Sequence, residues 1–427
     1  MKTLKQSLFM VACLGGVASG NAFNINEHDA RVTGRGGASA ASNTDASSVI
    51  FNPGGIPIAE GTQVSIAGSV YFASGSYEDA AGETETDSDP SIVPAIYLTS
   101  RVHDMIAVGI GFHLPFGLAV SWPDNHRQAD VIQDQTLRTY FITPSIGLNL
   151  HKQVPGLSIG GGVDIVPATI KLERAVRFGD VEGTATLGGD AVGIGGRVGV
   201  MYHPPAAKGL KLGVMYRSKI DLDFEGTGDF DIADPFRAAL PPDGDITAGI
   251  SLPQSVWGGV AYSPIPQLEL ELNTVWINWA DTWEDDALTI GLADGTETSS
   301  PQEYKNTLTW RIGAEYAVNE KAAVRAGFIY DPTPISSRTQ TAQLPDIDRK
   351  NVALGGSYKF GTLAAHLGFL WVTPGTRETS DTPYQPFFKG TYGVQAFVAS
   401  LMISGSFGGS GSPASTAPVA DPTVASR

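Results

Sequence analysis

Alternating apolar and polar side chains form the most informative pattern in this chain of 427 residues. In residues 211–225 the even positions hold Leu, Val, Tyr, Ser, Ile, Leu and Phe, while the odd positions hold Lys, Gly, Met, Arg, Lys, Asp, Asp and Glu. Because successive side chains of a strand point to opposite faces, this run predicts one strand with an apolar face and a charged face. Such a strand suits a wall between lipid and a polar lumen, although strands of soluble sandwiches share the pattern.

Similar runs recur along the chain and predict about fourteen strands, an even number as in single-chain bacterial barrels. Many runs exceed the roughly 9–11 residues that a tilted strand needs to cross a membrane. Short polar links such as residues 319–321 alternate with long polar segments, which are predicted to be outer loops. The predicted strands lie near residues 62–73, 91–101, 105–114, 137–150, 156–172, 185–203, 209–224, 246–263, 266–280, 305–318, 321–331, 350–361, 363–373 and 391–407. The predicted outer loops cover residues 74–90, 115–136, 225–245, 281–304 and 332–349.

The start of the chain has the composition of a secretory signal peptide. Lys2 and Lys5 are basic, and residues 7–18 are mostly apolar but too few to span a bilayer. Residues 20–22 (Gly-Asn-Ala) form a small-x-small cleavage site, so the mature chain is predicted to begin at Phe23.

Cys13 is the only cysteine, and cleavage after Ala22 removes it. The mature chain then holds no disulfide, no zinc–thiolate site and no cysteine nucleophile. A lipoprotein signal that lipidates Cys13 is the alternative interpretation, but Met10 is a poor residue for such a signal.

Composition favours a barrel and excludes several other classes. After the signal, no run of about 18 apolar residues predicts a transmembrane helix. The 51 glycines and 9% aromatic residues suit barrel bends and interfacial girdles, and the net charge of −16 argues against nucleic-acid binding. Residues 78–89 carry only acidic charges, which predicts a solvated loop; a divalent-cation site is the alternative. Motifs of metalloproteases, serine hydrolases and P-loop enzymes are missing, so we expect no enzyme, cofactor or metal.

The last predicted strand ends at Phe407, an aromatic terminus that typically directs outer-membrane assembly machinery to a barrel. Residues 391–407 are apolar on both faces, which indicates a hydrophobic transported ligand or a protein plug in the lumen. Residues 408–427 lack apolar periodicity and are predicted to form a disordered polar tail.

Residues 23–61 are not strand-like, and their motifs carry a family resemblance. The segment includes Phe23-Asn24-Ile25, a glycine-rich run at 34–38 and the motif Asn52-Pro53-Gly54. It resembles the N-terminal hatch of the FadL family of outer-membrane long-chain fatty acid and hydrocarbon transporters, whose hatch ends in Asn-Pro-Ala. Three further stretches resemble that family in the same order, namely residues 116–145, 252–279 and 330–349.

The resemblance implies an all-β fold, namely a transmembrane antiparallel β-barrel of about fourteen strands with a hatch inside the lumen. The expected organisation is a signal peptide (1–22), a hatch (23–61), the barrel (62–407) and the polar tail (408–427). It implies a monomer in the outer membrane of a Gram-negative bacterium, surrounded by outer-membrane lipid. The expected ligand is a fatty acid or another hydrophobic small molecule, which leaves an internal pocket sideways at a kinked third strand.

The resemblance also indicates ligand-binding residues. Phe23, Asn24 and Ile25 are expected to reach the pocket, with a frayed terminus as the alternative. Arg174 lies in a stretch similar to the one that supplies a carboxylate-binding arginine in the family, and Lys305 is a second candidate. The alternative for Arg174 is an ordinary arginine at the rim that pairs with an acid.

Other candidate residues are expected to shape the hatch and the wall. Asn52 and Pro53 are interpreted as structural, and Gly54 tolerates any backbone angle. The segment Pro115, Phe116 and Gly117 interrupts the third strand and is the candidate for a lateral opening; a strand that simply enters a loop is the alternative. The acidic and basic residues of the late loop are interpreted as ion pairs and turn caps. They are Asp331, Asp346, Asp348 and Arg349.

The sequence therefore predicts passive uptake of hydrophobic molecules across the outer membrane. Three other functions stay open at this stage: a porin for small polar solutes, an outer-membrane esterase or phospholipase, and a structural or adhesive barrel. The sequence does not distinguish between fatty acids, alkanes and aromatic compounds as cargo.

Overall fold

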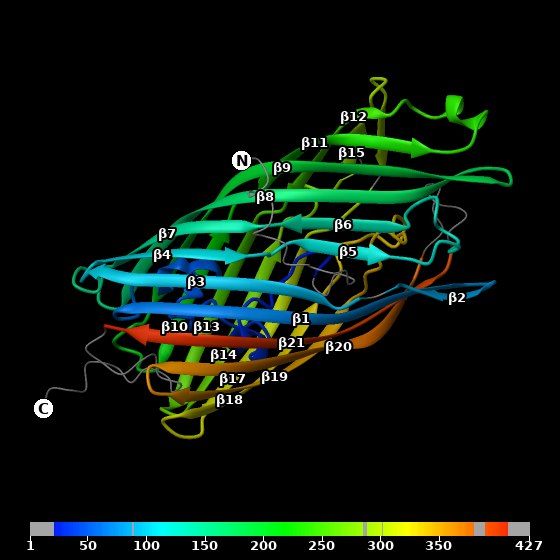
Figure 1. The fold of residues 1–427 in the computed structure, drawn as a ribbon. Coiled ribbons are helices and arrows are strands. Elements are labelled where there is room, and N and C mark those ends of the chain that lie inside the picture. The colour runs from blue at the N-terminus through cyan, green and yellow to red at the C-terminus, as the bar shows by residue number, and fades with distance from the viewer. Residues whose placement is uncertain (1–20, 88, 285–287, 301, 380–388, 409–427) are drawn as a thin grey trace, which may run out of the picture.

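The structure is a computed structural model that describes residues 21–87, 89–284, 288–300, 302–379 and 389–408. Figure 1 shows an antiparallel barrel with short helical segments inside it. Its wall has fourteen strands, as predicted, and the ring closes between the first and the last of them. The predicted signal peptide up to residue 20 and the predicted tail beyond residue 408 lie outside the described residues.

Ten wall strands are continuous and four are interrupted once. The continuous strands are β1 (Thr62–Asp79), β3 (Ser91–His103), β8 (Leu157–Phe178), β9 (Val181–Tyr202), β14 (Leu268–Ile277), β17 (Thr307–Ala317), β18 (Ala322–Asp331), β19 (Arg349–Phe360), β20 (Leu363–Glu378) and β21 (Thr391–Phe407). The interrupted strands are β4 (Ile106–His113) with β5 (Gly117–Ser121), β6 (Asp134–Thr139) with β7 (Phe141–Asn149), β10 (Leu210–Arg217) with β11 (Ile220–Asp231), and β12 (Gly244–Leu252) with β13 (Ser255–Ile265). Short elements of the outer loops are β2 (Gly82–Glu85), η2 (Phe236–Ala239), β15 (Leu288–Gly291) and β16 (Glu297–Ser300).

The outside of the wall carries a broad band of exposed apolar side chains. On β17, Trp310 and Ile312 are 44% and 56% exposed, whereas the intervening Thr309 and Arg311 are buried in the lumen. This confirms the alternation that the sequence predicts for this strand. A soluble monomer rarely exposes a continuous apolar surface of this extent, whereas a lipid-facing wall requires one.

The prediction for residues 211–225 is only half right. Val214 and Tyr216 do face outward, but from Ile220 onward the even residues point into the lumen and the acids point out. The faces exchange because residues 218 and 219 insert one extra step between β10 and β11, and a shift of one residue turns every following side chain to the other face. From residue 220 outward, this part of the barrel wall therefore has a charged outer face and an apolar inner face.

The outer part of the wall also extends further than the sequence predicts. Residues 225–245 were expected to be a loop, yet β11 continues to Asp231 and β12 begins at Gly244. Likewise, β8 and β9 leave only residues 179–180 as a link. These extensions carry many polar residues because their outer faces meet water, which is why a membrane-strand pattern does not find them.

Residues 21–60, which we call the hatch segment, fold inside the barrel. They contain α1 (Ala30–Gly34), α2 (Ser48–Phe51) and the 3₁₀ turn η1 (Pro53–Gly55). Asp29 caps α1 by accepting hydrogen bonds from the amides of Arg31 (2.7 Å) and Val32 (3.1 Å). None of the helices in the described part of the chain is long and apolar enough to cross a membrane.

Close backbone contact joins the hatch segment to the wall. A Cβ atom added to Gly34 of α1 would lie 2.8 Å from the Cα atom of Gly355 on β19. Glycine at both positions therefore allows an approach that any side chain would prevent.

Buried ion pairs hold the hatch segment in place. Arg35 contacts Glu269 (Nη1–Oε1, 3.1 Å) and Glu271 (Nη2–Oε2, 3.1 Å) of β14, and Lys211 contacts Glu269 at 2.6 Å. Glu271 also accepts a hydrogen bond from the amide of Ala41 at 2.8 Å. These charges are buried, so each depends on its partners for the solvation that water would supply.

Replacing Arg35 with Met should loosen the hatch segment, because two buried carboxylates lose their shared partner. We expect the docking of the hatch segment to become less favourable by roughly 3–5 kcal/mol. Hydrogen exchange of residues 30–41 in the folded barrel measures this change. Arg237→Met is the control, since Arg237 pairs with Asp243 in an exposed outer loop and should change exchange little. Equal protection in Arg35→Met and the wild type would contradict the role of these ion pairs.

Candidate functional site

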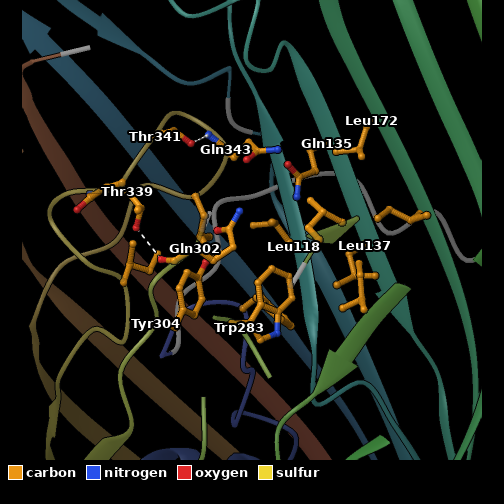
Figure 2. Close-up of a pocket in the computed structure, with 17 residues that line it drawn as sticks. Leu118, Gln135, Leu137, Leu172, Trp283, Gln302, Tyr304, Thr339, Thr341 and Gln343 are labelled. Carbon is orange, nitrogen blue, oxygen red and sulfur yellow. Dashed lines mark hydrogen bonds between the residues drawn. The ribbon is translucent and has the colours of Figure 1, made fainter. Parts of the chain in front are cut away.

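An apolar cavity lies inside the barrel beside the start of the hatch segment. Its space amounts to about 590 Å³, including the part that opens toward solvent. Figure 2 shows the side chains that surround it. They are Phe23, Leu118, Gln135, Leu137, Ile170, Leu172, Ile250, Trp283, Leu288, Gln302, Tyr304, Ile335, Thr339, Gln340, Thr341, Gln343 and Leu344.

Two kinds of surface meet in this cavity. Wall strands supply aliphatic side chains, such as Leu118 from β5 and Leu137 from β6, which lie side by side in Figure 2. The outer loop of residues 332–348 supplies neutral hydroxyl and amide groups. Loop contacts include a hydrogen bond from Thr339 Oγ1 to the carbonyl of Gln302 (2.6 Å). Since none of the lining residues carries a formal charge, the cavity suits an apolar ligand with few polar atoms.

Phe23 forms the centre of an aromatic cluster at this cavity. Its ring centroid lies 5.1 Å from Trp279, 5.2 Å from Trp283 and 5.8 Å from Phe116. Tyr304 stacks on Trp283 at 5.4 Å. Ring pairs in these orientations contribute attraction beyond the area they bury, so the first hatch residues form one side of the cavity.

Asn21 and Ala22, which the predicted cleavage removes from the mature chain, also contact the wall just before Phe23. Asn21 Oδ1 accepts hydrogen bonds from Trp279 Nε1 (2.5 Å) and Thr307 Oγ1 (3.2 Å), and its Nδ2 donates to Asp331 Oδ1 (3.2 Å). The amide of Ala22 donates to Asp346 Oδ2 at 3.2 Å. Asp331 and Asp346, interpreted from sequence as loop-organising, therefore lie beside the start of the predicted mature chain.

The backbone of residues 23–25 pairs with residues 115–117, where the third wall strand is interrupted between β4 and β5; we call residues 115–117 the wall interruption. Ile25 N donates to the carbonyl of Pro115 (2.8 Å), Gly117 N donates to the carbonyl of Phe23 (3.0 Å), and Asn24 forms a β-bridge with Phe116. Figure 1 shows β4 and β5 following one another along this strand. The structure thus brings two groups of predicted site residues, 23–25 and 115–117, into direct contact.

The ladder between the third wall strand and its neighbour β3 stops at this interruption. The pairs between β3 and β4 end at Ile96 and Phe112, while the pairs between β3 and β1 continue to Ser91. Positions 91–95 of β3 continue the ladder with β1 beyond the last pair with β4. The ladder between the third wall strand and β3 is therefore interrupted here, and residues 23–25 of the hatch segment lie beside the interruption.

A second apolar surface continues from the cavity toward the outer loops. It shares Ile170 and Leu172 with the cavity and adds Leu187, Phe224 and Ile246. These side chains belong to the region where the barrel is apolar inside and charged outside. Apolar side chains therefore extend from the outer strands to the cavity beside Phe23.

The two predicted carboxylate-binding residues are not part of the cavity lining. Arg174 is exposed on β8, two residues beyond Leu172, and Lys305 is exposed before β17. Neither belongs to the residues that line the cavity. Their carboxylate-binding role stays a prediction.

The Asn-Pro-Gly motif joins the hatch segment to the wall. Asn52 Nδ2 donates to the carbonyls of Ala40 (2.6 Å) and Val200 (3.1 Å), and Asn52 Oδ1 accepts from Gly54 N (3.0 Å). Pro53 begins the 3₁₀ turn that follows. These contacts agree with a structural role for the motif.

Sequence reasoning missed several residues of the cavity. Trp283, Tyr304 and the loop residues 339–344 contribute to it, but no periodicity marks them because they belong to irregular segments. The tryptophans within residues 276–283 are a sequence signal that could have indicated this region. Among the described residues, no group of three or more His, Cys, Asp or Glu side chains is placed to hold a metal ion.

Burial makes His28 of the hatch segment resist protonation. The ring is buried, and its Nε2 lies 2.9 Å from the carbonyl of Ile25. Burial lowers the pKa of His28 from 6.5 to about 4, and the nearby Arg217 and Arg197 oppose its protonation further. The ring of His113 also lies close, at 5.6 Å.

Acid should therefore weaken docking of the hatch segment. A depressed pKa means that the docked segment binds fewer protons than the released one, so docking is complete above about pH 6.5 and weakens as the pH falls toward 4. The shift corresponds to roughly 3 kcal/mol. Hydrogen exchange of residues 23–35 in His28→Gln should depend less on pH than in the wild type, after correction for intrinsic exchange. An identical pH dependence in both proteins would exclude His28 as the cause.

The geometry defines a class: a closed barrel with a lipid-facing outside, an internal hatch and a lumenal apolar cavity. The sequence profile of the outer membrane protein transport protein family (OMPP1/FadL/TodX) matches residues 11–407. The chain belongs to this family, which consists of transport proteins rather than enzymes, and it is an outer-membrane protein.

Individual relatives cover nearly the whole chain. Outer membrane protein P1 of Haemophilus influenzae is 26% identical over 87% of this chain and 90% of the relative. The long-chain fatty acid transport protein of Escherichia coli K12 is 22% identical over 88% and 93%. A Pseudomonas aeruginosa FadL homologue has the same fold (TM-score 0.81, 18% identity, 91% of this chain and 100% of that one). The Pseudomonas putida toluene transporter TodX also shares it (TM-score 0.71, 20% identity, 91% and 99%).

Proposed function

We propose that this protein takes up hydrophobic small molecules, such as long-chain fatty acids or related hydrocarbons, across the outer membrane without an energy source. The apolar cavity beside Phe23 is the observation that carries the proposal. The names of two relatives support it, because one is a long-chain fatty acid transport protein and another a toluene transporter.

Burial of the ligand drives its capture. Each CH₂ group that leaves water for the cavity contributes roughly 0.8 kcal/mol. The apolar surface around Phe224 and Ile246 receives the ligand near the outer loops and passes it to the cavity by way of Ile170 and Leu172. Outward-facing acids on the same strands keep the outer wall soluble above the lipid.

The ligand leaves sideways through the wall at residues 115–117. Hydrogen bonds join these residues to residues 23–25 of the hatch segment, the ladder with β3 stops before them, and β6 pairs with Gly117. A shift of the segment breaks these few bonds and opens a path from the cavity to lipid. The porin for polar solutes, which the sequence left open, has no comparable support, because the hatch segment occupies the lumen.

Filling the cavity should block binding. Leu137→Trp adds bulk to a buried side chain of the lining, and overpacking of this kind costs about 1–3 kcal/mol, so we expect roughly tenfold weaker binding of a fluorescent fatty acid. Leu354→Trp is the matched control, because Leu354 is 59% exposed on the outside of the wall. Unchanged affinity in Leu137→Trp would argue against the cavity as the binding site.

Obstructing the wall interruption should block release but not capture. A Cβ atom on Gly117 would lie 3.1 Å from Ile25 Cδ1, so Gly117→Trp places a large ring in the proposed exit. Uptake into cells that lack other transporters should fall to roughly a tenth, as for an obstructed gate, while the purified protein still binds ligand. Gly68→Trp is the control, since nothing lies within 4 Å of a Cβ at Gly68. Normal uptake by Gly117→Trp would contradict lateral exit at this place.

A further inference from the structure

Arg217, the last residue of β10, carries a buried guanidinium without an anionic partner. The residue is 5% exposed and points into the lumen. Its Nε has no hydrogen-bond acceptor, and the guanidinium forms no ion pair with any described residue. Buried charges are normally paired, so this cation is suited to a partner that arrives from outside the protein.

The groups around Arg217 do not neutralise its charge. Its cross-strand neighbour is Arg197 of β9, which is paired with Asp164 (Nη2–Oδ1, 2.8 Å) and donates to the carbonyl of Ile50 at 2.9 Å. His113 Nε2 lies 3.4 Å from Arg197 Nη2, and the His28 ring packs against His113. This cluster holds two guanidiniums and one carboxylate, and that carboxylate is already engaged by Arg197.

Arg217 also lies on the proposed route of the ligand. Its Cζ is 4.6 Å from the centroid of the Phe116 ring. The same ring packs against Phe23 at the cavity and against Phe141 of β7 (6.2 Å). Phe116 belongs to the wall interruption, so the cation lies beside the proposed exit, on a ring that also packs against Phe23 at the cavity.

We propose that Arg217 binds the carboxylate of an anionic amphiphile, such as a long-chain fatty acid, as it moves from the cavity to the wall interruption. This inference rests on the proposed function and narrows its substrate class to carboxylates. The planar guanidinium can donate two parallel hydrogen bonds to one carboxylate, and burial strengthens that attraction. A neutral hydrocarbon of the same length gains nothing from this site, whereas its alkyl part uses the apolar cavity equally well.

The ring contact alone does not account for Arg217. Arg311 offers a comparison, because its Cζ lies 4.7 Å from the Trp257 ring. That guanidinium also donates to the carbonyl of Gly37 at 3.3 Å and so holds the hatch segment. Arg217 has no such structural bond, which makes Arg311 the matched control for a buried arginine on an aromatic ring.

The test compares one ligand with and without its charge. Oleate and methyl oleate are titrated into the purified, folded barrel in a non-ionic detergent, and the ratio of their Kd values is measured. Arg217→Met should weaken oleate binding roughly tenfold, as expected for loss of a charge-assisted pair, and leave methyl oleate unchanged. Arg217→Lys should restore part of the preference for oleate, whereas Arg311→Met should alter both ligands by the same factor.

Three outcomes would overturn the proposal. An unchanged oleate-to-ester ratio in Arg217→Met would exclude the carboxylate contact. Loss of the ratio in Arg174→Met, with Arg217→Met normal, would assign the carboxylate to Arg174 instead. Wild-type protein that binds neither ligand would refute the proposed function itself, and this inference with it. If Arg217→Met does not assemble, Arg217→Gln permits the same comparison.

Discussion

Lipid offers no hydrogen bonds, so every backbone group of the wall must find its partner within the protein. The pairing of β1 with β21 meets this requirement by closing the ring. The requirement is not met by wall strands alone at residues 114–116, where β4 ends and β5 has not begun. There the backbone of residues 23–25 supplies the missing bonds, so the hatch segment becomes part of the barrel wall.

This arrangement joins three regions that could otherwise act separately. Phe23 forms one side of the cavity, its carbonyl accepts a hydrogen bond from Gly117, and its ring packs against Trp279 and Trp283. A ligand that displaces Phe23 must therefore disturb bonds in the wall and contacts to an outer loop. The cavity, the wall interruption and the outer loop are therefore coupled directly, because the same few residues contribute to all three.

Charge is distributed unevenly inside the barrel. The cavity is lined by neutral side chains, whereas buried ion pairs hold the hatch segment against β14 and Arg217 lies beside an Arg197 that is already paired with Asp164. Buried pairs contribute little net stability, but removing one partner is costly. They therefore keep the hatch segment in one register while the neutral cavity stays open to apolar molecules.

The sequence by itself determined the class of fold, the number of wall strands and the presence of a non-strand segment at the start. It could do so because alternation along one strand is a local property that lipid and lumen impose on neighbouring residues. The predicted faces of residues 218–225 were wrong, because a single inserted residue exchanges the two faces of the strand without altering the order of apolar and polar residues. Only the tertiary structure brought residues 21–25, 115–117, 279–283 and Arg217 together. Contacts between segments so distant in the chain depend on barrel closure and on the path of the hatch segment, which no local pattern records.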